Sequence, residues 1–410
     1  MGRYTVLKDP EADATVQRVL DKVCGEVATL LGSNLQAILL VGGYGRGEGG
    51  VYKGGETYHL VNDLDLLVFV KNGLRQAKAK FGDSLKQLSH QLLVDGRGLK
   101  EIDIELADTR HYRFFVPNTV AYYEISQGHQ VIYGDLELDK VMPKLDPTRL
   151  PVYEGTNYFR NRGSGLLIAA LYFLCNGFDK DERRWNFFIE LQKACQAMGD
   201  SALLMAGRYH LSYRERLQRL RELDPGQIEL SESLYNKVRP LYEWGMIKKI
   251  LPDFAWTGNK EAIDFWKHVR DIFGDFFLWF ESKRLSREFQ DWGGYAEFIY
   301  QKGIRAPLNL RLLWLLKWLR SSIKKPASLR FKRNSHSISL MIMPILLFYL
   351  GRENEVLRLK IWPVVSRLLE LDPSESPFSS WKTAVGRFLL RYYPTRTVKD
   401  AVSMLTSSED

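Results

Sequence analysis

The chain has 410 residues, of which 45% are hydrophobic and 26% are charged, and its formal net charge is +9. This composition excludes wholesale disorder, and the length allows two or three domains that each bury a core. The three cysteines are too few and too scattered for a disulfide framework or a thiolate metal site. The N-terminus lacks the apolar run of a signal peptide, so we expect a cytoplasmic protein.

Charge is distributed unevenly along the chain. Residues 1–150 carry 18 basic and 20 acidic residues, whereas residues 151–410 carry 40 and 29. Ten basic residues and no acidic one lie in the segment 302–333. A run of this kind forms a solvated face, or it faces a polyanion such as nucleic acid or an anionic membrane, and the sequence leaves these readings open.

The first 150 residues show an α/β pattern of apolar residues. In chain order, the expected elements are a helix over 12–31 that ends at Gly32, strands over 37–41 and 64–70, a helix over 72–93, and a strand over 101–108. The N-terminal region is therefore predicted to be an α+β domain, with a mixed sheet and flanking helices, over residues 1–150.

From Tyr153 onward, long apolar stretches follow helical spacing and are broken by glycines and prolines. We expect a mostly α-helical region over 151–410, with a candidate further boundary near 225–260. The segment ISLMIMPILLFYL (338–350) is shorter than the roughly 20 apolar residues that a transmembrane helix needs. It predicts a buried helix, and we expect no transmembrane segment.

Two motifs in the first region carry chemistry. VGGYGRGEGG (41–50) follows an apolar strand, and its glycines would let backbone N–H groups approach an anion, although such a segment is more often only a turn. Asp63 and Asp65 are separated by one residue on a strand, so their side chains project from one face, about 7 Å apart. Neighbouring carboxylates repel each other, and a divalent cation is their natural partner; a solvated strand start is the structural alternative.

A third acidic strand extends the second motif. EIDIELAD alternates strictly, with Ile102, Ile104 and Leu106 on one side and Glu101, Asp103 and Glu105 on the other. If this strand lies beside 64–70, Asp103 or Glu105 would reach the same metal ions. Two metal ions bridged by three carboxylates suit in-line phosphoryl chemistry. The choice between Asp103 and Glu105 depends on the register of the sheet.

A strand, two glycines, Asp-x-Asp on the next strand and a further acid on a third strand resemble the DNA polymerase β-like nucleotidyltransferase superfamily. GGYGRGE (42–48) is similar to the nucleotidyltransferase domain of the PII uridylyltransferase. The resemblance implies that Gly42 and Gly43 hold the phosphates of an NTP. It also implies that Asp63 and Asp65 bind Mg²⁺ in a two-metal site, with Asp103 as the third carboxylate.

The sequence departs from this family in two ways. Gly43 and Asp63 lie about twenty residues apart rather than the usual dozen, so residues 51–61 are expected to form an inserted hairpin or loop. No His-Asp dipeptide occurs in the chain, so the HD hydrolase domain that accompanies the PII uridylyltransferase is absent.

Four other residues are weighed as site candidates. Arg46 would contact a phosphate, or it is a surface residue of the turn, and Glu48 is expected to cap or pair locally. Residues 189–216 resemble the helix-turn-helix of small-molecule and protein nucleotidyltransferases, in which a lysine and a tyrosine can face the nucleotide; this resemblance makes Lys193 and Tyr209 candidates. The alternative for both is a partly buried amphipathic helix pair.

The resemblance implies a Mg²⁺-dependent enzyme that transfers an NMP from an NTP to a hydroxyl of a small molecule or protein and releases pyrophosphate. Asp103 would assist deprotonation of the acceptor. One alternative is an RNA 3′-end nucleotidyltransferase that uses the basic segment 302–333. Another is a non-catalytic nucleotide-binding or membrane-surface adaptor. The sequence specifies neither the base of the NTP, nor the acceptor, nor the oligomeric state.

Overall fold

The computed structural model divides the chain into two compact units, and the first is assembled from three separate segments. Unit 1 consists of Met1–Leu150, Gly207–Arg219 and Met246–Asp253, and unit 2 consists of Pro151–Ala206, Leu220–Gly245 and Phe254–Asp410. The structure describes residues 2–7, 9–71, 73–93, 99–114, 116–303, 335–348, 362–372 and 380–407. Sequence reasoning did not identify 207–219 and 246–253 as parts of the unit that contains the N-terminal region.

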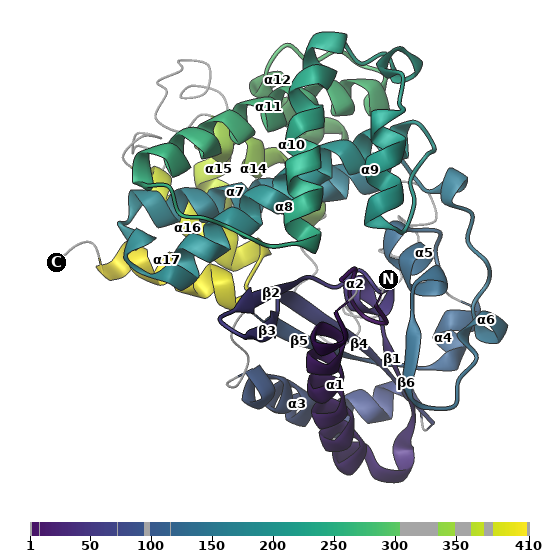
Figure 1. Ribbon diagram of the computed structural model, residues 1–410. Coiled ribbons are helices and arrows are strands. Elements are labelled where there is room, and N and C mark those ends of the chain that lie inside the picture. The colour runs from purple at the N-terminus through teal and green to yellow at the C-terminus, as the bar shows by residue number, and fades with distance from the viewer. Residues whose placement is uncertain are drawn as a thin grey trace, which may run out of the picture. The chain divides into compact units, whose positions relative to one another are not determined.

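A four-stranded sheet in the order β5-β4-β1-β6 forms the centre of unit 1 (Figure 1). Its strands are β1 (Leu35–Leu40), β4 (Asn62–Val70), β5 (Leu99–Ala107) and β6 (Gln130–Gly134). β4 and β5 run parallel, whereas β1 is antiparallel to both β4 and β6. The predicted mixed sheet is confirmed.

Helices cover both faces of this sheet. One face packs against α1 (Pro10–Leu31) and α3 (Leu74–Leu93), and the other packs against α4 (Thr109–Phe114), α5 (Val120–Gln127) and α6 (Leu138–Val141). The strand alternation decides which side chains go where: Leu64 and Leu66 belong to the core with α1 and α3, and Leu67 and Phe69 belong to the core with α4, α5 and α6.

Local signals set both ends of α1, and the sequence predicted the C-terminal one. Asp9 is its N-cap and accepts a hydrogen bond from the backbone N–H of Glu11, and Pro10 occupies the first helical position. Gly32 follows the last turn with φ 54°, a backbone conformation that favours glycine. The predicted end of this helix at Gly32 is confirmed.

The insertion over residues 51–61 forms a hairpin of β2 (Val51–Gly54) and β3 (Thr57–Leu60), which confirms one of the two predicted forms. The hydroxyl of Tyr44 ties both ends of the hairpin to the glycine-rich turn. It donates to the carbonyl of Gly50 at 2.6 Å and accepts from the backbone N–H of Val61 at 3.0 Å.

In the described part of unit 2 the assigned elements are helical. Its α-helices are α7 (Tyr153–Leu174), α8 (Asp181–Met205), α10 (Glu232–Ile250, which ends in unit 1), α11 (Asn259–Leu285), α12 (Trp292–Lys302), α14 (Ser335–Phe348), α15 (Trp362–Leu369), α16 (Trp381–Tyr392) and α17 (Arg396–Ser407). An aromatic core joins them; for example, the rings of Phe159 and Phe277 stack with centroids 4.6 Å apart.

The apolar segment 338–350 falls largely within α14, and its described residues from Leu340 to Leu347 are buried, as predicted for a buried helix. Within the described residues, no helix combines the length and the apolar character that crossing a bilayer requires. Apart from Lys302 and Gly303, the basic segment 302–333 lies outside the described residues. Its predicted contacts with a polyanion or a membrane therefore stay a prediction.

Candidate active site

The Asp-x-Asp pair lies at the beginning of β4, where the strand enters the sheet. Asp63 and Asp65 project from the face to which Leu67 and Phe69 also belong, because side chains alternate along a strand. Leu64, between them, is fully buried in the core on the opposite face. The apolar alternation of β4 therefore fixes both carboxylates on one side of the sheet.

The parallel pairing of β4 with β5 supplies the third acid. Asp103 is the register partner of Asp65, whereas Glu105 is the partner of Leu67, one step further along the same face. The register thus places Asp103 beside Asp65, and Glu101 beside Asp63, whereas Glu105 lies further from the Asp-x-Asp pair. Asp103 and Glu105 both keep contact with solvent, although the surrounding protein partly buries the Asp103 carboxyl group.

The glycine turn, residues 42–47, begins where β1 ends, and it passes over Asp65. The backbone N–H of Val41 donates to the carbonyl of Asp65 at 3.0 Å, and Gly42 follows with φ 67°. A Cβ atom added at Gly42 would overlap Oδ2 of Asp65. Only glycine combines this backbone conformation with such a close approach to a carboxylate.

Gly42 and Gly43 begin the short helical turn α2 (Gly42–Gly45), which orients their backbone N–H groups. Val41 is its N-cap and provides no side-chain hydrogen bond to the turn. The first N–H groups of a helical turn have no acceptor within the turn, so those of Gly42 and Gly43 are available to an anion. Both glycines are partly exposed.

The three carboxylates form a zone of negative charge that is only partly offset. Burial, followed by the charge of Asp63, raises the pKa of Asp65 to about 6, and Asp103 adds to the rise. Burial also raises the pKa of Asp103, together with the charges of Glu105 and Asp63. A proton or a cation bound to one of these carboxylates therefore reduces the repulsion among them.

Lys249 supplies positive charge to this zone, and sequence reasoning missed it. It belongs to the segment Met246–Asp253, which packs in unit 1, and its charge opposes the rise in the pKa of Asp65. A Cβ atom added at Gly50 would lie 2.8 Å from the carbonyl oxygen of Lys249. The close approach at Gly50 therefore brings this remote segment beside the glycine-rich turn.

The donor set fits Mg²⁺, which the resemblance implies. Among the described residues, no three His, Cys, Asp or Glu side chains form a group that would hold a metal ion. Mg²⁺ commonly binds one or two carboxylates and completes its coordination with water and substrate phosphates. Asp63 and Asp65 supply such carboxylates, and the raised pKa of Asp65 marks negative charge that a cation would stabilise.

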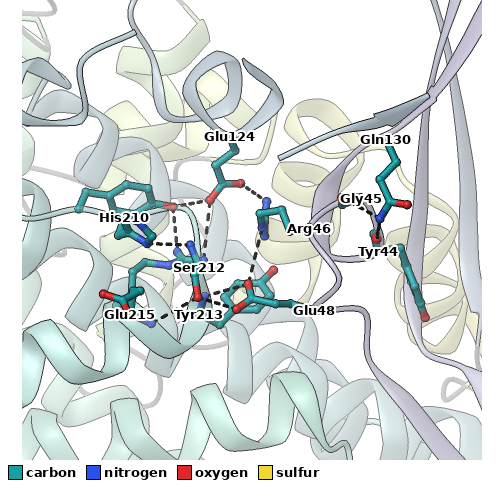
Figure 2. Close-up of polar contacts among 12 residues, drawn as sticks. Tyr44, Gly45, Arg46, Glu48, Glu124, Gln130, His210, Ser212, Tyr213 and Glu215 are labelled. Carbon is teal, nitrogen blue, oxygen red and sulfur yellow. Dashed lines mark hydrogen bonds and ion pairs between the residues drawn. The ribbon is translucent and has the colours of Figure 1, made fainter. Parts of the chain in front are cut away.

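The side chain of Arg46, predicted as a phosphate contact or a surface residue, is buried. Its Nη1 donates to Oε2 of Glu124 at 3.0 Å, and its Nε lies 3.8 Å from Oε2 of Glu48. The Arg46 side chain is 3% exposed, and its guanidinium lies over the ring of Tyr213. Figure 2 shows it directed toward Glu124 and Glu48.

Glu48 caps a helix that is remote in sequence. One carboxylate oxygen accepts from Oγ of Ser212 at 2.6 Å, and the other accepts from the backbone N–H of Tyr213 at 2.9 Å. Tyr213 opens α9 (Tyr213–Arg221), so Glu48 stabilises the first turn of that helix. The local pairing expected for Glu48 exists with Arg46, but the helix that it caps is not local.

Tyr209 joins the same cluster, because its hydroxyl donates to Oε1 of Glu124 at 2.6 Å and accepts from Nη1 of Arg216 at 2.8 Å. Tyr209 is 1% exposed. We refer to these seven residues as the Arg46 network: Arg46, Glu48, Glu124, Tyr209, Ser212, Tyr213 and Arg216. Lys193 is half-buried on α8 in unit 2, and its contact with a nucleotide stays a prediction.

Comparisons with known proteins include a weak structural likeness. No protein-family model and no curated protein matches the chain. A solved structure of spectinomycin adenyltransferase AAD(9) from Enterococcus faecialis, with ATP and spectinomycin, is 13% identical and has a TM-score of 0.34. The match covers 62% of this chain and 99% of that one. This TM-score is too low to support a shared fold, so function rests on the site itself.

Proposed function

We propose that this chain is a Mg²⁺-dependent nucleotidyltransferase that transfers an NMP from an NTP to a hydroxyl of a small molecule or protein. The observation that carries the proposal is the approach of the Gly42 backbone to Asp65, beside the register pair of Asp65 and Asp103. The backbone N–H groups that we propose bind phosphate and the carboxylates that we propose bind Mg²⁺ are thus neighbours. A metal-bound triphosphate has the charges that both require.

Each group at the site has a role in this proposal. The N–H groups of Gly42 and Gly43 bind phosphate oxygens of the NTP, and the Lys249 ammonium adds positive charge beside them. Asp63 and Asp65 would hold Mg²⁺, which when bound neutralises charge on the triphosphate and on the leaving pyrophosphate. The Arg46 and Tyr209 side chains already bind Glu124, so the proposal gives them no phosphate contact.

Asp103 acts on the acceptor. The acceptor oxygen attacks the α-phosphorus, the new O–P bond forms, and the bond between the α-phosphorus and the bridging oxygen breaks to release pyrophosphate. Asp103 takes the acceptor proton. Burial and the neighbouring carboxylates raise the pKa of Asp103, which makes it a stronger base than an isolated aspartate.

The proposal concerns a small-molecule or protein acceptor. The RNA 3′-end and adaptor alternatives depend on the basic segment 302–333, most of which lies outside the described residues. The specific resemblance to the PII uridylyltransferase likewise stays a prediction.

Isothermal titration of the four NTPs with Mg²⁺ tests the proposal. Wild type is expected to bind at least one NTP, and an Asp63→Ala/Asp65→Ala double variant is expected to lose at least about 100-fold in affinity. Glu105→Ala is the matched control, because Glu105 lies on the same sheet face one register step away. Absence of binding by wild type, or equal binding by the double variant, would refute the proposal.

A further inference from the structure

We infer that the Arg46 network holds the glycine turn in its nucleotide-binding conformation, with Glu124 and Arg216 as positioning residues. The inference rests on the proposed function for the identity of the ligand. Its structural part, that a buried charge network sets the conformation of residues 42–47, stands on contacts within unit 1.

The network continues directly from the turn. The backbone N–H of Arg46 lies 3.3 Å from the carbonyl oxygens of Gly42 and Gly43, and the N–H of Glu48 donates to the carbonyl of Gly43 at 2.8 Å. The peptide groups that lead into both charged side chains therefore close the turn. A displacement of either side chain would be transmitted to the glycines through one or two residues of backbone.

The far end of the network is anchored to other segments of unit 1. Glu124, on α5, accepts from Arg46 and Tyr209, and it also lies 3.8 Å from Nη2 of Arg216. The guanidiniums of Arg46 and Arg216 both lie over the ring of Tyr213, at 5.0 and 4.7 Å from its centroid. The turn is thereby fixed to α5 and to residues 209–216 together (Figure 2).

The charges within the network balance. Two arginines face two glutamates; the side chains of Arg46, Glu48 and Arg216 are 2 to 3% exposed, and that of Glu124 is 22% exposed. Although burial opposes it, the charges of Arg46 and Arg216 hold the pKa of Glu124 below its usual range. A balanced and buried network has one favoured arrangement, because displacing any member leaves another charge without compensation.

Two neighbouring contacts hold the turn from other directions. Nε2 of Gln130, on β6, lies 3.1 Å from the carbonyl oxygen of Gly45 and 3.4 Å from that of Tyr44. A Cβ atom added at Gly128 would overlap Cγ of Arg46, so the aliphatic part of that side chain packs directly on the Gly128 backbone. These contacts leave Arg46 directed toward Glu124.

The test combines amide hydrogen exchange of residues 42–49 with titration of the Mg²⁺-bound NTP, using Glu124→Gln and Tyr209→Phe. Glu124→Gln removes the negative charge of Glu124. Tyr209→Phe removes only the hydroxyl that donates to Glu124, and it keeps the test possible if Glu124→Gln does not fold. Leu20→Ala, a core truncation in α1, is the control for general loss of stability.

The inference predicts faster exchange at residues 42–49 in both network variants and not in Leu20→Ala. Affinity for the NTP is expected to fall about tenfold or more in Glu124→Gln, and less in Tyr209→Phe. Unchanged exchange in the network variants, or the same increase in Leu20→Ala, would overturn the inference. Absence of nucleotide binding by wild type would overturn the proposed function, while the exchange data would still decide whether the network sets the turn.

Discussion

Two charged clusters of unit 1 are joined to the same glycine turn, and they differ in charge balance. The carboxylates of Asp63, Asp65 and Asp103 have one sign, and burial with mutual repulsion raises the pKa of Asp65 to about 6. The Arg46 network contains both signs, and its arginines lower the pKa of Glu124 despite burial. The same folded unit therefore raises the pKa of one carboxyl group and lowers that of another.

The difference separates a ligand site from its support. An unbalanced cluster that is partly open to solvent is stabilised when it binds a cation, whereas the charges of a balanced buried cluster already compensate one another. Arg46 illustrates why sequence proximity to the glycines is a poor guide to role. Its guanidinium pairs with Glu124 and Glu48, so its charge acts on Asp65 only from a distance, and a bound phosphate would be met by Lys249 and by bound metal.

The largest expected effect comes from removing one negative charge from the Arg46 network. Glu124→Gln leaves two buried arginines short of one negative charge, and we expect a loss of about 3–5 kcal/mol in the free energy of unfolding, measured with urea. Glu137→Gln is the control, because the ion pair of Glu137 with Lys140 is largely exposed. An exposed pair contributes at most about 1 kcal/mol. Equal losses would show that the network is not a special source of stability.

Gly42→Ala sharpens the comparison at the turn that joins the clusters. We expect a loss of about 2 kcal/mol in unfolding free energy, from positive-φ strain and from displacement of Asp65, together with loss of NTP binding. Gly55→Ala is matched, since its φ of 68° is nearly that of Gly42 and a Cβ atom there would meet nothing within 4 Å. If both variants bind an NTP equally well, the contact between Gly42 and Asp65 has no functional role.

Asp65→Asn removes one negative charge from the unbalanced cluster and so reduces the repulsion among its carboxylates. The pKa of Asp65 is raised from 3.8 to about 6, so the folded state binds a proton more tightly than the unfolded state, and stability falls as the pH rises through that window. The variant should therefore be more stable than wild type by about 1–3 kcal/mol above pH 6. The gain should disappear near pH 4. Denaturation at several pH values measures it, and a gain independent of pH would contradict the electrostatic explanation.

Ser212→Ala is the mildest perturbation of the balanced cluster. It removes the hydroxyl that donates to Glu48 at the start of α9, and we expect a loss of about 1 kcal/mol. Ser231→Ala removes an exposed hydroxyl that accepts from the backbone N–H of Leu234 at the start of α10, with a similar loss. Amide exchange of residues 42–49 should rise in Ser212→Ala only. A rise in both variants would show that stability alone controls the turn.

Much of the fold in unit 1 was predictable because its signals are local. The apolar run before the glycines became β1, the run after Asp63 became β4, and the alternating EIDIELAD became part of β5. Periodicity shows which residues share a face, so it placed Asp63 and Asp65 together. It does not set the register between strands, and only the pairing of Asp65 with Asp103 distinguishes Asp103 from Glu105.

The supporting part of the site was not predictable in the same way. Glu48 binds Ser212 across 164 positions, and Arg46 binds Glu124 across 78. Contacts of this kind leave no periodic pattern, and the individual residues read as ordinary turn or helix residues. Lys249 was missed for the same reason, since its segment joins unit 1 only in the folded chain.

Binding of Mn²⁺, followed by electron paramagnetic resonance in the presence of a non-hydrolysable NTP analogue, tests the central claim most directly. The claim is that the unbalanced carboxylates hold a divalent cation together with a nucleotide. The control contains Mn²⁺ and the analogue without protein. We expect wild type to reduce the signal of unbound Mn²⁺ below that of the control, and Asp63→Asn/Asp65→Asn to leave it at the level of the control. Equal binding of Mn²⁺ by the two proteins would contradict the claim.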